Sequence, residues 1–246
     1  MVVDPELARL LEHPAIWRGR SAARAEVLPT GFAALDESLP GKGWPRTGLI
    51  EILVSRFGSG ETYLLFPALA ALTRRPAARW CVWVPGERRD FCPAYPIAES
   101  GLRPFRPVDK RRDFCPAYPS LVPFAPALAA HGLALERVLV VRAQRQALWA
   151  FEQTLGSGAC DVAMAWGQRP RLRELRRLQL AAERGRALGV LFRPRHAARE
   201  SSPAALRVVL EPATEGVRVT LLKSRGGARG SIELTWQMAG LPVAGS

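Results

Sequence analysis

The segment at residues 49–65 has the spacing of a phosphate-binding loop that follows a strand and opens a helix. Such loops read G-x-x-x-x-G-K-[S/T], and their backbone N–H groups and lysine hold the phosphates of a nucleotide. With Thr62 aligned to the last position, Gly60 takes the second glycine, Glu61 the lysine and Ser55 the first glycine. The spacing of the loop, with Gly60 and Thr62, is kept, whereas the charge at its lysine position is reversed.

The reversed charge predicts that this loop does not bind ATP. A lysine about 4 Å from a phosphate is attracted by roughly 4 kcal/mol at an effective dielectric of 20, and a glutamate replaces that attraction with repulsion. Because about 1.4 kcal/mol is a tenfold change, we expect the affinity to fall by at least about a thousandfold. The Walker B acid is also missing, since the apolar strand at residues 161–166 begins with Asp161 and ends with Trp166.

Other catalytic chemistry has no motif to support it. No serine or cysteine lies in a recognisable nucleophile motif, the histidines are scattered, and the cysteines show no C-x-x-C spacing. We therefore expect no catalytic residue, no cofactor and no metal, and we interpret the protein as not being an enzyme. The first residues contain no apolar secretory segment, and the longest apolar stretch, residues 63–72, is too short for a bilayer. These features favour a cytoplasmic protein with no membrane partner.

The elements that position this loop alternate between apolar runs of strand length and helical periods. The sequence predicts strands at 48–54, 80–84, 137–141, 161–166 and 189–192, and helices at 63–74, 124–131, 144–155 and 171–186. Three later runs, at 206–210, 217–222 and 231–236, are typical of antiparallel strands joined by turns. The pattern predicts an α/β fold, with a mostly parallel sheet flanked by helices and antiparallel strands at the C-terminal edge.

The 246 residues are enough for one large domain with short flanks. We predict an N-terminal arm at residues 1–25, a core at 26–237 and a C-terminal tail at 238–246. Inside the core, the nonapeptide RRDFCPAYP occurs at residues 88–96 and again at 111–119. The surrounding segment, 87–121, has no hydrophobic period and is rich in turn-forming residues. It is interpreted as an exposed loop insertion with an internal duplication.

The chain is strongly basic, with 35 Lys and Arg against 22 Asp and Glu and a net charge of +13. This excess indicates a polyanionic partner or the arginine-rich coding of a GC-rich genome. In the helix at 171–186, arginines alternate with Glu174 and Glu183, which is typical of a solvated face and leaves nucleic acid or an acidic partner as the alternative. The stretch at 193–199 is more purely basic, and its candidate contacts with nucleic acid or a partner are Arg193, Arg195, His196 and Arg199.

Several motifs taken together resemble one family. The features Thr30-Gly31, Leu35-Asp36, the Gly41-x-Gly43 turn, Gly48 and Glu51 are similar to the opening of the RecA core. More closely, the chain resembles the ImuA proteins, which are RecA-like and related to SulA. This resemblance rests on His13-Pro14 with Trp17-Arg18-Gly19 and on the blocks LPTGFAALDESLPGKGWPRTGL, AAHGLALERVLVVR, CDVAMAWG, LRRLQLAAERGRALGVLFRP and VTLLKSRGGARGSIELTW. It covers nearly the whole chain except residues 87–121.

The resemblance implies a RecA-like fold and an accessory, non-catalytic role in SOS-induced, error-prone translesion DNA synthesis. The implied partners are ImuB, RecA and a DnaE-type error-prone polymerase, with DNA as a further one. It places the stretch after Phe192 where RecA has a DNA-binding loop, and it makes Lys223 and Arg225 further contacts. Trp17 and Arg18 become a docking element of the arm. Two alternatives are a SulA-like cell-division inhibitor and, disfavoured by Glu61 and Trp166, an ATP-dependent recombinase.

Overall fold

The computed structural model describes residues 26–55, 57, 60–86, 123–143, 146–167, 169–214, 216–224 and 230–235. The predicted arm at 1–25, the insertion at 87–121 and the tail at 238–246 lie outside the described residues. Within the described part, an eight-stranded sheet has the order β10-β9-β8-β3-β7-β6-β4-β5. None of the described helices has both the length and the apolar character that crossing a bilayer requires.

The sheet is parallel over most of its width. The strand β3 (Gly48–Val54) pairs with β7 (Leu188–Pro194) and β8 (Leu206–Ala213), and β7 pairs in turn with β6 (Cys160–Trp166). The strand β4 (Trp80–Val84) joins β6 to the edge strand β5 (Val138–Val140), also in parallel. At the other edge, β9 (Gly216–Ser224) and β10 (Gly230–Thr235) continue antiparallel. The predicted α/β class, with antiparallel strands at the C-terminal edge, is confirmed.

The central position of β3 follows from its sequence. Its residues Gly-Leu-Ile-Glu-Ile-Leu-Val are buried along the whole strand. A parallel strand that is covered on both faces has such a continuous apolar run, rather than alternating apolar and polar residues. Glu51 is the exception, and its charge is neutralised by partners described below.

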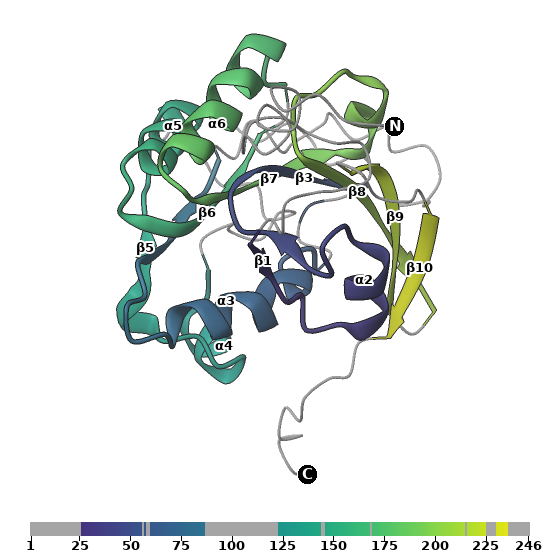
Figure 1. Ribbon diagram of the computed structural model, residues 1–246, viewed down its shortest axis with the longest axis horizontal. Coiled ribbons are helices and arrows are strands. Elements are labelled where there is room, and N and C mark those ends of the chain that lie inside the picture. The colour runs from purple at the N-terminus through teal and green to yellow at the C-terminus, as the bar shows by residue number, and fades with distance from the viewer. Residues whose placement is uncertain are drawn as a thin grey trace, which may run out of the picture.

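Helices cover both faces of the sheet (Figure 1). On one side lie α5 (Ala147–Gly156) and α6 (Leu172–Arg184), and on the other α3 (Phe66–Thr73) and α4 (Ala125–Ala130). The buried Gln179 side chain links α6 to the sheet, because its Oε1 accepts a hydrogen bond of 2.9 Å from the backbone N–H of Leu49. At the end of α6, a Cβ on Gly185 would lie 1.8 Å from the carbonyl oxygen of Leu155 in α5, so only glycine permits this close packing.

Some elements differ from the prediction. Before β3, where no strand or helix is predicted, β1 (Val27–Leu28) and β2 (Trp44–Pro45) form a small antiparallel pair around α2 (Ala33–Ser38). The helix predicted at 63–74 begins as a 3₁₀ turn, η1 (Tyr63–Leu65), before α3. Two further 3₁₀ turns are η3 (Leu135–Arg137) and η5 (Arg195–Arg199). Such short turns lack the length over which a helical period is recognised.

Candidate functional site

The loop between β3 and α3 lies at the carboxyl end of the parallel strands, where open α/β sheets hold their ligands. Ser55, directly after β3, is exposed, and Thr62 is half-buried. Gly60 has a φ of +92°, a conformation that favours glycine. Glu61 is buried, with 4% of its surface exposed. Because η1 follows Thr62, the regular α-helix begins only at Phe66.

Glu61 and Trp166, the two residues that replace the expected lysine and acid, contact each other. The indole Nε1 of Trp166 donates a hydrogen bond of 3.3 Å to Oε1 of Glu61, and both side chains are buried. Trp166 ends β6, two strands away from the loop-bearing β3. The sequence identifies both substitutions separately, and the structure places them together as a donor and its acceptor.

The Trp166 ring is held between two other aromatic rings. It stacks on Trp83 of β4 with centroids 5.6 Å apart and on Phe192 of β7 with centroids 4.7 Å apart. All three side chains are almost fully buried. Aromatic pairs of this kind contribute about 0.5–1.5 kcal/mol beyond the area that they bury. The carboxyl ends of β4, β6 and β7 are therefore joined by packed rings.

This arrangement is opposite in character to a nucleotide site. It presents a carboxylate where a phosphate would need a cation, and a hydrophobic ring where a metal would need an acidic ligand. The carboxylate and the indole are hydrogen-bonded to each other.

Asp161, the acid at the other end of β6, forms ion pairs and hydrogen bonds that connect segments of the fold. Its Oδ1 forms ion pairs with Arg46 and, at 3.0 Å, with Nε of Arg79, and its Oδ2 accepts a bond of 2.9 Å from the backbone N–H of Arg79. Burial alone would raise the pKa of Asp161, but the hydrogen bonds and charges of Arg46 and Arg79 outweigh it and lower the pKa below its usual value. Asp161 thus ties β6 to the segments before β3 and β4.

Arg193, one of the candidate contacts with nucleic acid or a partner, has a completely buried side chain. Its Nη1 pairs with Oε1 of Glu51 at 3.2 Å, and its Nη2 pairs with Glu200 at 2.6 Å. A second arginine, Arg207 of β8, donates from Nε to Oε2 of Glu51 at 2.7 Å, and Ser202 donates to Oε1 at 2.8 Å. Glu51 requires these partners because an unpaired buried carboxylate is strongly destabilising.

The other residues of the basic stretch lie on η5 rather than in an irregular loop. Arg195 is more than half exposed and pairs with Glu211 at 2.6 Å, while His196 and Arg199 are exposed. Lys223 is half-buried, and its Nζ donates to the backbone carbonyl of Ser202 at 2.8 Å. Arg225, Trp17 and Arg18 lie outside the described residues. The structure therefore leaves Arg195, His196 and Arg199 accessible and gives Arg193 and Lys223 internal partners.

The Glu51 cluster is the feature that the sequence interpretation misses. One signal is available, namely a single carboxylate in the middle of a fully apolar strand, which must find a cation from a neighbouring strand. Sequence alone does not say which of many arginines supplies it, because Arg193 and Arg207 come close to Glu51 only through the order of β7, β3 and β8.

Two buried thiols have no nucleophilic character. Burial raises the pKa of Cys81 to about 12. Burial also raises the pKa of Cys160 to about 11, against the opposing effect of the Arg79 charge. Both are therefore protonated at neutral pH, and a thiol reacts as its thiolate. Among the described residues, no group of three or more His, Cys, Asp or Glu side chains could hold a metal ion.

Comparison with known proteins gives a similarity in structure but none in sequence. No protein-family model matches the chain, and no curated protein matches its sequence. Among solved structures, SulA from Pseudomonas aeruginosa is similar, with 20% identity and a TM-score of 0.37. The similarity covers 59% of this chain and 97% of that one.

Proposed function

We propose that the protein is a non-catalytic, RecA-like accessory protein of SOS-induced, error-prone translesion DNA synthesis. The observation that supports the non-catalytic part is the hydrogen bond between Glu61 and Trp166. A carboxylate and an indole, bonded to each other and buried, stand at the two positions where an ATPase needs a lysine and an acid. The fold of a nucleotide-binding protein is then retained for its surface contacts, without an ATP cycle.

The resemblance of the motifs to the ImuA proteins supports the cellular role. On this proposal the chain acts with ImuB, RecA or a DnaE-type error-prone polymerase, and it connects partners rather than transforming a substrate. Its buried ion pairs favour a rigid scaffold, because they connect segments that are distant in the sequence. Glu51 pairs with Arg193 and Arg207, and Asp161 pairs with Arg46 and Arg79.

Nucleotide binding is tested by titrating purified protein with a fluorescent ATP analogue and magnesium. We expect no saturable binding in the micromolar range for the wild type, and the same result for Thr62→Ala. Thr62→Ala is the matched control because Thr62 is the loop residue that would bind a metal. Micromolar binding in the wild type that Thr62→Ala abolishes would contradict the proposal.

The partner is tested by affinity capture from DNA-damaged cells followed by mass spectrometry. We expect ImuB, RecA or the DnaE-type polymerase to be retained. Trp17 and Arg18 lie outside the described residues, but a tryptophan next to an arginine has the composition of an interface hot spot. Changing both to alanine should weaken capture without changing the far-UV spectrum or the melting temperature. A SulA-like inhibitor would instead bind the tubulin-like cell-division protein. If that protein is retained, the SulA-like alternative replaces the translesion role.

A further inference from the structure

Two kinds of structure cover one face of the sheet. Leu49, Glu51 and Leu53 of β3 point to this face, because every second side chain of a strand lies on the same side. Leu49 packs in a cluster with buried residues of α5 and α6, whereas Leu53 packs against Ala197 of η5. The segment 195–205, which contains η5 and leads from β7 to β8, thus covers a neighbouring part of the same face. We call this segment the strap.

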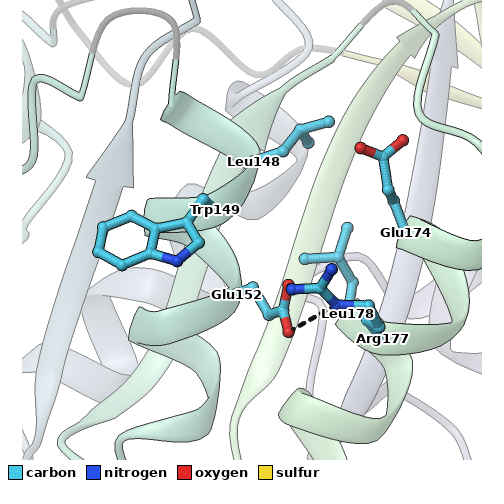
Figure 2. Close-up of a pocket in the computed structure, with 6 residues that line it drawn as sticks. All are labelled: Leu148, Trp149, Glu152, Glu174, Arg177 and Leu178. Carbon is cyan, nitrogen blue, oxygen red and sulfur yellow. Dashed lines mark hydrogen bonds and ion pairs between the residues drawn. The ribbon is translucent and has the colours of Figure 1, made fainter.

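The two helices are held on the sheet by large apolar side chains. Phe151 of α5 and Leu175 and Leu178 of α6 are buried in one cluster with strand residues. An ion pair of 2.7 Å between Arg177 and Glu152 also joins the helices, across the groove shown in Figure 2. Hydrophobic stabilisation increases with the apolar area that is buried, so the helices are fixed mainly by packing.

The strap has almost no packing of this kind. Its buried residues are Ala197, Ala204 and Ala205, and its sequence contains no leucine, isoleucine, valine or phenylalanine. An alanine buries much less apolar area than a leucine and contributes correspondingly less. Other interactions must therefore hold the strap on the sheet.

Arginines of the two strands that flank β3 supply these interactions, and they converge on Glu200. Nη2 of Arg193 in β7 pairs with the Glu200 carboxylate at 2.6 Å. Arg207 in β8 donates from Nη1 to the backbone carbonyl of Glu200 at 2.9 Å, and from Nη2 to the carbonyl of Ala197 at 2.7 Å. Glu200 thus provides both a side-chain and a backbone acceptor, one for each strand.

Three further side chains add weaker links. Ser202 donates to Oε1 of Glu51 at 2.8 Å, and Lys223 of β9 donates to the backbone carbonyl of Ser202 at 2.8 Å. Arg195 pairs with Glu211 at 2.6 Å, but its side chain is more than half exposed, and exposed ion pairs contribute little. The Glu200 contacts are therefore the main polar attachment of the strap.

The sheet keeps its buried carboxylate paired without the strap. Glu51 accepts from Nη1 of Arg193 at 3.2 Å and from Nε of Arg207 at 2.7 Å, and all three residues belong to strands. If the strap lifts, Glu51 loses only the hydroxyl of Ser202, and water replaces the carbonyls and the carboxylate that leave the arginines. No unpaired buried charge results, so lifting the strap avoids the main cost of breaking a buried ion pair.

We propose that the strap is a lid that opens as a separate unit of local unfolding and that Glu200 holds closed. When closed, it fixes the accessible side chains of Arg195, His196 and Arg199 relative to the sheet. When open, it carries these three side chains away together, while β3, β7 and β8 stay paired. This inference goes beyond the proposed function and does not depend on it, because opening is measured on purified protein without nucleotide, DNA or partner.

The test is amide hydrogen exchange resolved by residue with NMR. The backbone N–H of Ala205 donates to the carbonyl of Leu49 at 2.8 Å, so its exchange reports on the attachment of the strap to β3. In the wild type we expect this amide to exchange at least tenfold faster than the amides in the middle of β8. Its rate should not change in low concentrations of urea, because a local opening exposes little new surface.

The variant Glu200→Gln keeps the size of the side chain but removes its charge. It should increase the exchange rate of Ala205 about tenfold and leave the amides of β8 and α6 unchanged. Ser202→Ala, a milder change that tests the same unit should Glu200→Gln not fold, should increase the rate about threefold. The matched control is Glu152→Gln, which also removes a glutamate charge from an ion pair on this face, between α5 and α6 (Figure 2). It should leave the exchange of Ala205 unchanged.

Three results would overturn the proposal. One is that Ala205 and the middle of β8 exchange at the same rate in the wild type, which would mean that the strap and the sheet open together. Another is that Glu200→Gln accelerates β8 as much as Ala205. The third is that Glu152→Gln accelerates Ala205 as much as Glu200→Gln or Ser202→Ala does, because the effect would then be a general loss of charge.

Discussion

Two sets of arginines differ in their surroundings. Those of β7 and β8 are buried, whereas those of α6 are exposed. Arg193 and Arg207 are buried around Glu51, where each guanidinium donates to a carboxylate or a carbonyl. Arg173, Arg176 and Arg184 lie on α6 and are exposed. A net charge of +13 counts both sets equally, yet only the second can attract a polyanion.

The comparison shows why a basic stretch in a sequence is a weak guide to a binding surface. Residues 193–199 are the more purely basic of the two segments, but the first arginine of the stretch belongs to a central strand. The helix at 172–184 contains acids that lower its apparent charge, although Glu174 and Glu183 are hydrogen-bonded within the helix region. Position relative to the sheet, rather than charge density, decides which arginines meet solvent.

The largest effect should come from Arg193→Ala. Removing this side chain leaves Glu51 with one fewer cation in a fully buried site, and Glu200 also loses its partner. Breaking a buried ion pair from one side costs about 3–5 kcal/mol, so we expect the free energy of unfolding to fall by that amount in urea titrations. Arg199→Ala, an exposed neighbour on η5, is the control and should change it by less than about 0.5 kcal/mol. Equal small effects would show that Arg193 is not part of the fold's core.

Asp161→Asn should have the next largest effect, about 2 kcal/mol, because hydrogen bonds to a charged group are worth about 1.5–3 kcal/mol. The pKa of Asp161 is below its usual value of 3.8 in the folded protein. A lowered pKa adds stability above the unfolded-state pKa, and this stability is lost as the pH falls from about 4 through the folded pKa. Unfolding measured from pH 7 to pH 2 should therefore show a smaller loss of stability at the acid end for Asp161→Asn. An identical acid slope in both proteins would contradict the assigned ion pairs.

Much of this architecture could be predicted from the sequence, because it follows from local pattern. The strand at 48–54 and the helix at 171–186 are recognised by a continuous apolar run and a helical period. The substitutions at Glu61 and Trp166 are also visible, since each is defined by its place relative to a strand. Their hydrogen bond and the Glu51 cluster are set by strand order, and a local pattern contains no information on it.

A smaller effect is expected at the loop itself. Trp166→Phe keeps a ring between Trp83 and Phe192 but removes the Nε1 donor to Glu61. Losing one hydrogen bond to a buried carboxylate should lower the free energy of unfolding by about 1–2 kcal/mol. In a double-mutant cycle with Glu61→Met, which removes the acceptor at similar volume, the two effects should be non-additive, because each change removes the same interaction. Additive effects would mean that the Trp166 indole and the Glu61 carboxylate do not interact.

The smallest effect on stability should come from the double variant Arg173→Gln with Arg184→Gln. This variant distinguishes the exposed arginines of α6 from the buried arginines of β7 and β8. Both side chains are exposed, and neither forms an ion pair within the described residues, although the Arg184 guanidinium lies against Gly156 at the end of α5. Their loss also reduces the repulsion among neighbouring arginines, which offsets any lost packing of their aliphatic stems. We therefore expect the free energy of unfolding to stay within about 0.5 kcal/mol of the wild-type value in the same urea titrations. A loss above about 1 kcal/mol would place these arginines with Arg193 as structural residues.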